Sequence, residues 1–248
     1  MSAVDVFRVF PDAQSVARHA AGILADLSRI PGQKVCNVAL SGGSTPQKLF
    51  ELLAAKPLCD EVDWSRLRFF WGDERCVPAE SPDSNFGWAQ RLLFEPNNIS
   101  PEQIYAINGE NDPANEAEHY GAILSGQLPL SPEGFPAFDL VFLGMGDDGH
   151  TASLFPGDKA ALESHSVCVA VRHPQSGQDR VSITLPVINA ARMVVFMVTG
   201  AAKKAAVSDI RESWPQTGSL PASRVRPHPG RLRWLLDLAA ASPRVSAD

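Results

Sequence analysis

The sequence predicts an α/β fold in which an open, mostly parallel sheet carries helices on both faces. Three observations support this prediction. Short apolar runs of strand length alternate along the chain with segments whose apolar residues recur at helical spacing. Several of these runs end in polar, glycine-rich turns, as strands do at the ligand-binding edge of Rossmann-like sheets. The 248 residues contain no repeat and no low-complexity linker, so we expect one domain over residues 1–248.

The first half of the chain alternates apolar runs with amphipathic segments. Strands are expected over residues 4–10, 35–40, 67–71 and 104–107. Helices are expected over residues 12–28, 47–55, 83–94 and 113–127. Asp12 can cap the first of these helices, and Pro46 suits the first turn of the second. Gly72–Arg75 follows the third strand and is expected to be a polar turn.

The second half continues the alternation. Strands are expected over residues 138–143, 167–171, 180–185, 193–199 and 232–236. Pro186 starts a short helix, and Gly200 opens another that continues to about residue 212. The last strand leads into the end of an alanine-rich helix. The proline-rich segments 128–136 and 227–230 are expected to be surface loops.

The balance of charge limits the class of partner. The sequence has 22 Lys and Arg against 28 Asp and Glu, which gives a formal net charge of −6. A nucleic-acid-binding protein normally presents a basic face, so no nucleic-acid partner is expected. No apolar stretch reaches transmembrane length, so no membrane contact is expected. An acidic protein can still hold an anionic substrate in a locally positive site.

The spacing of cysteines and histidines predicts no metal centre. Neither a CxxC pair nor an HExxH motif occurs, and no small disulfide framework is visible. Cys36 and Cys168 lie in apolar runs, where a buried thiol is expected. The N-terminus lacks the basic start and long apolar core of a signal peptide. Together these features fit a reducing, cytoplasmic location.

Three glycines follow the strand at 138–143 and formally match the GxGxxG dinucleotide pattern. That pattern requires a long helix to open at the third glycine and an acidic residue further on. Pro156 and Gly157 interrupt the chain soon after Gly149, so dinucleotide binding is rejected. The histidine in this turn therefore needs another explanation.

His150 lies in this glycine-rich turn together with Asp147 and Asp148. A lone histidine is more often structural than catalytic. An imidazole beside two carboxylates on a loop at the end of a strand favours a general base. The sequence contains no GxSxG motif, which argues against a serine hydrolase.

A turn of small residues joins the second strand to the next helix. It consists of Ser41, Gly42, Gly43, Ser44 and Thr45. Free backbone N–H groups at a helix N-terminus, together with the helix dipole, can bind an anion, and three hydroxyl groups add donors. The GK[ST] ending of a Walker loop is missing. We therefore predict a phosphate site, with a plain capping turn as the alternative.

A further group of candidate site residues is basic. Arg180 starts a strand, and Lys203 and Lys204 lie in the first turn of a helix. Cations at a helix N-terminus oppose the helix dipole, which indicates an anionic partner. The alternative is that both lysines project into water.

The turn after the third strand holds Asp73, Glu74 and Arg75. Read alone, these residues fit a surface salt-bridge cluster as well as they fit a functional site. Their place at the end of a strand of the predicted sheet puts them at the same edge as the other turns.

Seven motifs follow one another along the chain: LSGGSTP, WGDERCVP, DSNFG, LGMGDDGHTASLFP, RVSITLPVIN, VTGAAKK and LPASRV. In this order they resemble the 6-phosphogluconolactonase family, from about Val4 to the C-terminal helix. LGMGDDGHTASLFP is highly specific. SGGSTP is shared with a wider superfamily that includes glucosamine-6-phosphate deaminase.

The deaminase is the alternative within this superfamily. Asp73, Asp148 and His150 match deaminase catalytic positions, but the deaminase glutamate falls where this chain has Phe155. Without that carboxylate, ring opening and loss of the amine lack part of their acid–base set. A non-catalytic sugar-phosphate binder that kept the fold is a third hypothesis.

The resemblance implies hydrolysis of 6-phospho-D-glucono-1,5-lactone to 6-phosphogluconate in the oxidative pentose phosphate pathway, without metal or cofactor. His150 would take a proton from water and return it to the ring oxygen, with Asp148 orienting the turn or the imidazole. Arg75 and loop N–H groups would stabilise the oxyanion, and Asp73 would contact sugar hydroxyls. The turn Ser41–Thr45 would bind the phosphate, with Arg180 and, by family spacing, Lys203 closing over it. The partner expected is this small sugar phosphate, bound by a monomer or weak homo-oligomer.

Overall fold

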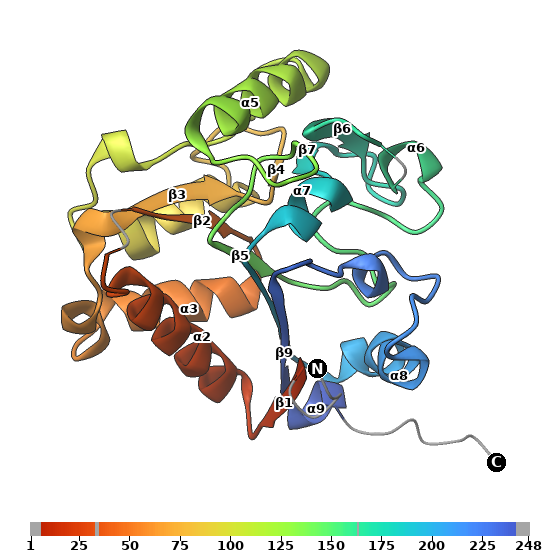
Figure 1. Cartoon of the computed structure of the whole chain (residues 1–248), viewed down its shortest axis with the longest axis horizontal. Coiled ribbons are helices and arrows are strands. Elements are labelled where there is room, and N and C mark those ends of the chain that lie inside the picture. Colours follow the sequence, from red (N-terminus) through yellow and green to blue (C-terminus); the bar gives the residue numbers. More distant parts are fainter. Residues whose placement is uncertain (1–5, 33–34, 163, 242–248) are drawn as a thin grey trace.

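A six-stranded parallel sheet forms the centre of the molecule (Figure 1). The computed structural model describes residues 6–32, 35–162 and 164–241. The strands run in the order β1-β9-β8-β5-β2-β3, and every neighbouring pair is parallel. Their bounds are β1 Phe7–Phe10, β2 Cys36–Leu40, β3 Leu67–Trp71, β5 Leu140–Leu143, β8 Met193–Val198 and β9 Arg231–Asp237. The predicted parallel α/β sheet is confirmed; Val4 and Asp5 of its first predicted strand lie outside the described residues.

A second, three-stranded antiparallel sheet was not predicted. It has the order β4-β7-β6, with β4 Asp73–Arg75, β6 Cys168–Arg172 and β7 Asp179–Ile183. The expectation that Gly72–Arg75 is a turn is therefore wrong. The chain leaves β3 and pairs at once with β7, since the Ile183 amide donates to the Gly72 carbonyl at 2.8 Å. This pairing partner lies more than a hundred residues away, so no local pattern could reveal it.

Helices cover both faces of the parallel sheet. Figure 1 shows α2 and α3 on one side, with α7 and the small sheet on the other. The helix bounds are α2 Ala13–Ser28, α3 Ser44–Ala54, α4 Asn85–Ala89, α5 Pro113–Gln127, α6 Lys159–Leu162, α7 Leu185–Ala190, α8 Lys204–Ser213 and α9 Leu238–Ala241. None of the helices in the described part of the chain is long and apolar enough to cross a membrane.

Several predicted boundaries differ from the structure. Helix α3 begins at Ser44, three residues earlier than expected, because Pro46 is tolerated in a first turn whose N–H groups have no helical partner. The predicted helix at 83–94 divides into α4 and a π-helical turn, Gln90–Phe94. The predicted strand at 104–107 is only a single bridge from Phe69 to Ile104.

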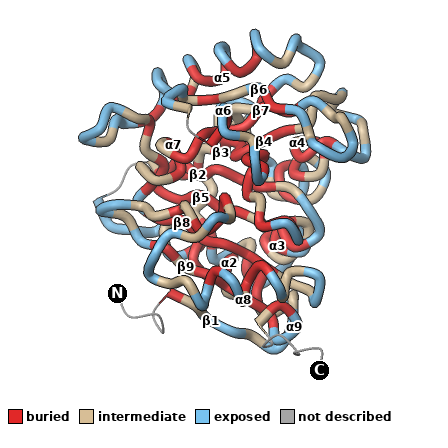
Figure 2. The backbone as a smooth tube through the Cα atoms, turned by 90° about the vertical axis from the view of Figure 1, so that its right-hand side faces the viewer, coloured by how far each residue is buried: buried red, intermediate tan, exposed pale blue. Residues whose placement is uncertain are grey.

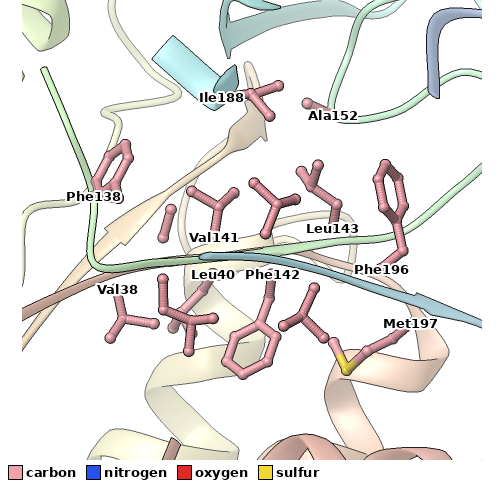
Figure 3. Close-up of a cluster of buried hydrophobic side chains, with 14 of the residues drawn as sticks. Val38, Leu40, Phe138, Val141, Phe142, Leu143, Ala152, Ile188, Phe196 and Met197 are labelled. Atoms are coloured by element: carbon pink, nitrogen blue, oxygen red, sulfur yellow. The ribbon is translucent and has the colours of Figure 1, made fainter. Parts of the chain in front are cut away.

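The central strands β2, β5 and β8 are buried, whereas the edge strand β1 and the outward sides of the helices are partly or fully exposed (Figure 2). In the close-up of Figure 3, Val141 and Leu143 of β5 point towards Ile188 and Ala152. Phe142, which lies between them in the chain, points to the opposite face. Because the central strands are covered on both faces, they read as continuous apolar runs, which explains why the sequence located them well.

Candidate active site

One cleft lies at the carboxyl ends of β2, β3, β5 and β8. Strand β2 leads outward to β3, whereas β5 leads the other way to β8 and β9, so the order reverses between β2 and β5. Open α/β sheets bind ligands in the crevice at such a switch point. The cavity here has a volume of about 300 Å³. The predicted site residues among those lining it are Ser41, Gly42, Gly43, Ser44, Thr45, Asp73, Arg75, His150, Arg180 and Lys203.

The loop after β2 forms one wall of the cleft with the N-terminus of α3. No side chain caps this helix in the described structure, so its first N–H groups remain available to an anion. A Cβ atom on Gly42 would lie 1.7 Å from the Asn85 Oδ1, so only glycine fits there. The hydroxyls of Thr45 and Thr199 lie 2.7 Å apart and join this loop to the loop after β8. The loop after β2 is thus held by contacts with Asn85 of α4 and with Thr199 in the loop after β8.

The loop after β5 holds His150 in a turn closed by its own hydrogen bonds. The backbone N–H of Gly146 donates to the carbonyl of His150 at 2.9 Å, and the Thr151 hydroxyl donates to the Gly144 carbonyl at 2.9 Å. The His150 Nδ1 lies 2.6 Å from the Asp148 Oδ1. A Cβ atom on Gly146 would lie 2.2 Å from that ring nitrogen, so the packing requires glycine. The sequence could not show that this glycine makes room for the imidazole.

The contact with Asp148 determines which ring nitrogen of His150 faces the cleft. Partial burial acts to raise the pKa of Asp148, but the His150 backbone N–H and the imidazole outweigh it and lower this pKa. The carboxyl is therefore ionised near neutral pH and only accepts hydrogen bonds. The neutral ring then carries its proton on Nδ1, which leaves Nε2 as an acceptor. Asp148 itself does not line the cavity.

Two arginines from the small sheet complete the cleft. Arg75 of β4 and Arg180 of β7 are direct partners in the antiparallel register. Like charges opposite one another destabilise a sheet, so an anion bound between them would stabilise the pair. Neither makes an ion pair within the described chain, and the Nε atoms of both are buried without a partner. Burial lowers the pKa of Arg180, although nearby Asp73 opposes this shift.

The acidic pair before Arg75 is not a surface salt-bridge cluster. Asp73 is 6% exposed, and its Oδ2 accepts a hydrogen bond from the Ser153 hydroxyl at 2.7 Å. Glu74 is 2% exposed and accepts three backbone N–H groups, from Arg75, Asn85 and Phe86. Burial raises the pKa of Glu74 more than these bonds lower it. Glu74 therefore fixes the start of α4, whereas Asp73 lines the cleft.

The structure distinguishes the two adjacent lysines. Lys203 ends the short 3₁₀ helix Ala201–Lys203 and lines the cavity. Lys204 begins α8 and is absent from the cavity wall. Of the two lysines, Lys203 therefore lies at the cleft, as the phosphate-binding prediction requires.

An aromatic residue stands beside the imidazole. Phe155 is 2% exposed, and its ring centroid lies 4.8 Å from that of His150. On its other sides it contacts the ring of His173 at 4.9 Å and the guanidinium of Arg180 at 5.8 Å. At this position a carboxylate would be buried between two imidazoles and an arginine.

Some residues of the cleft were missed by sequence reasoning. Asn85 lines the cavity, and its side-chain amide donates to the Asp73 carbonyl at 2.9 Å. Thr199 lines it from the loop after β8, and Ser153 holds the carboxylate of Asp73. The DSNFG motif contained the signal for Asn85, but its relevance depends on the contact with Gly42. In the part of the chain that the structure describes, no cluster of His, Cys, Asp and Glu could hold a metal ion.

The fold and the cleft are typical of an α/β enzyme that acts on a small anionic substrate. Residues 11–234 match the model of the glucosamine-6-phosphate isomerase/6-phosphogluconolactonase family, and the chain belongs to this family.

A 6-phosphogluconolactonase from Haemophilus influenzae is 39% identical over 204 residues, which cover 82% of this chain and 85% of the relative. The solved 6-phosphogluconolactonase structure from Trypanosoma brucei is 30% identical, with a TM-score of 0.83, and covers 95% of this chain and 97% of its own. A monomeric glucosamine-6-phosphate deaminase shares the fold, with a TM-score of 0.80, at 19% identity; it covers 96% of this chain and 100% of its own.

Proposed function

We propose that the protein hydrolyses 6-phospho-D-glucono-1,5-lactone to 6-phosphogluconate, the step of the oxidative pentose phosphate pathway implied by its family. One observation carries this proposal. A single cavity of about 300 Å³ is lined by the His150 imidazole on one loop and by a basic wall on the others. The basic wall consists of the loop Ser41–Thr45, with its free N–H groups, and of Arg180 and Lys203. Such a cavity can hold a sugar phosphate with its phosphate on the wall and its carbonyl carbon near the imidazole.

His150 acts as the general base in this proposal. Its Nε2 accepts a proton from the water that attacks C1, and Asp148 stabilises the imidazolium through Nδ1. When the tetrahedral intermediate collapses, the bond from C1 to the ring oxygen breaks and His150 returns the proton to that oxygen. The carboxylic acid formed then ionises. A lactone is an activated ester, so this route requires no metal and no covalent nucleophile.

The remaining side chains bind the substrate and the charge that develops on it. Arg75 is the candidate oxyanion donor together with loop N–H groups, because its buried Nε has no partner among the described residues. The loop Ser41–Thr45 would hold the phosphate with Arg180 and Lys203. Asp73, with one oxygen already occupied by Ser153, would accept from sugar hydroxyls through the other.

The deaminase reaction is less well supported. Phe155 packs against His150 where a deaminase would place its glutamate, so the acid–base set for ring opening is incomplete. A non-catalytic sugar-phosphate binder would retain the basic wall but would not need Asp148 on the Nδ1 of His150.

The test is the hydrolysis rate of freshly generated 6-phosphogluconolactone, with the unphosphorylated lactone as the control. Rapid turnover that depends on the phosphate supports the proposal. Ammonia release from glucosamine 6-phosphate would identify the deaminase instead. Binding of 6-phosphogluconate without a rate above spontaneous ring opening would identify the binder. The single domain, the cytoplasmic location and the monomeric or weakly oligomeric state stay predictions.

A further inference from the structure

A second groove lies outside the cleft, between helix α2 and the edge of the parallel sheet formed by β1 and β9. Its volume is about 650 Å³. Arg8 of β1 pairs in register with Leu235 of β9, and side chains alternate along a strand. Arg8 and Arg233 therefore lie on the same face of the sheet, the face against which α2 packs. Such a helix-covered face is normally apolar.

The groove is basic although the protein is acidic. Arg18 and His19 of α2 add to Arg8 and Arg233, and among the described residues Asp26 is the one carboxylate in the lining. None of the three arginines makes an ion pair with another described residue. Burial lowers the pKa of His19, and the charges of Arg8 and Arg233 lower it further, while Asp26 acts in the opposite direction. The Arg8 guanidinium also donates to the His19 Nε2 at 3.1 Å, which ties a residue of β1 to one of α2 inside the groove.

A glycine in the middle of α2 keeps the groove open. A glycine inside a helix makes the helix less stable than an alanine would, so a glycine at this position requires an explanation. A Cβ atom on Gly22 would have no neighbour within 4 Å, so neither backbone strain nor crowding explains it. Gly22 lines the groove, and any larger side chain there would project into it. The absence of a side chain at Gly22 therefore leaves this part of the groove open.

We propose that this groove binds a nucleoside di- or triphosphate, separately from the cleft at the strand ends. The guanidinium fork matches phosphate oxygens, and three arginines from three elements suit several linked phosphates rather than one. The lining runs along α2 from Ser15 to Asp26, which is about 16 Å at the helical rise per residue. That length exceeds a diphosphate alone, and Phe10 and Ile23 supply an apolar wall for the remainder.

Isothermal titration of the full chain with ATP, in the absence of Mg²⁺, tests the proposal. We expect saturable binding that Gly22→Leu weakens at least about tenfold by filling the groove, with Gly126→Leu in α5 as the matched control. The control is apt because Gly126 also has open space at its Cβ position and does not line the groove. Arg233→Gln should weaken binding by about tenfold or more, since it removes a charged hydrogen-bond donor. Arg231→Gln is the control for loss of charge on this strand and should change binding little, because Arg231 does not line the groove.

Binding at the cleft must be distinguished from binding at the groove. Lys203→Ala should retain ATP binding, because Lys203 lies at the other site. Inorganic pyrophosphate should bind more weakly than ATP with the same order of variants, and adenosine should not bind. The proposal is overturned if ATP gives no binding, if Gly22→Leu binds like the wild type, if Lys203→Ala alone abolishes binding, or if adenosine binds as well as ATP.

Discussion

The parallel sheet brings its functional groups to the cleft on loops, whereas the small antiparallel sheet brings them on the strands themselves. His150 and the Ser41–Thr45 turn follow β5 and β2 and are held by local hydrogen bonds and by contacts between loops. Arg75 and Arg180 project from paired strands, with a register that holds two like charges side by side. The loops thus bring the imidazole and the free N–H groups to the cleft, and the small sheet brings two arginines together with Asp73.

The largest expected effect tests the loop side of this comparison. His150→Ala should lower kcat by about 10²–10⁴ with KM nearly unchanged, since it removes the proposed base and leaves the basic wall. His173→Ala is the matched control, because this ring lies 6.5 Å from His150 and does not line the cavity. Steady-state kinetics measures kcat and KM for both variants. A kcat of His150→Ala equal to that of the wild type would refute the assignment of His150 as the base.

Arg180→Gln tests the contribution of the small sheet. It should lower kcat/KM by roughly 10–100-fold, mainly by raising KM, because a buried donor to the phosphate is lost. Arg172→Gln in the neighbouring strand β6 should have little effect, since its side chain is exposed and outside the cleft. Equal loss for the phosphorylated and unphosphorylated lactones would show that Arg180 does not act on the phosphate.

A smaller difference is expected between the two adjacent lysines. Lys203→Ala should raise KM by roughly tenfold or less, because Lys203 lines the cavity but is more exposed than Arg180. Lys204→Ala should leave KM unchanged. KM is measured for both variants over the same series of substrate concentrations. A larger rise in KM for Lys204→Ala than for Lys203→Ala would assign the phosphate contact to Lys204.

The smallest effect concerns stability and pH. In the folded protein the pKa of Asp148 lies below its ordinary value. The ionised carboxylate therefore stabilises the fold fully at any pH above that ordinary pKa, and this contribution is lost as the pH falls through the folded pKa. Asp148→Asn should therefore lower the free energy of unfolding at neutral pH and have no effect in strong acid. The side chain is 37% exposed, so after solvent screening we expect no more than roughly 0.5 kcal/mol. Urea unfolding at several pH values measures it; a deficit that persisted in acid would contradict this origin.

The sequence by itself determined the parallel sheet and most of the groups in the cleft. Strands β2, β5 and β8 are covered on both faces, so their apolar runs are continuous and the glycine-rich turns after them stand out. The carboxyl ends of parallel strands meet at one edge, which is why Ser41–Thr45, His150 and Lys203 could be placed together from their order alone.

Only the tertiary structure decided what joins these groups. Strand β4 exists because Asp73–Arg75 pairs with β7, a partner distant in the sequence. Asn85 belongs to the cleft because it fills the space that Gly42 leaves. Likewise, the register that places Arg8 and Arg233 on one face depends on pairing between the two ends of the chain. Local patterns record burial and backbone preference, whereas such contacts depend on how distant segments pack.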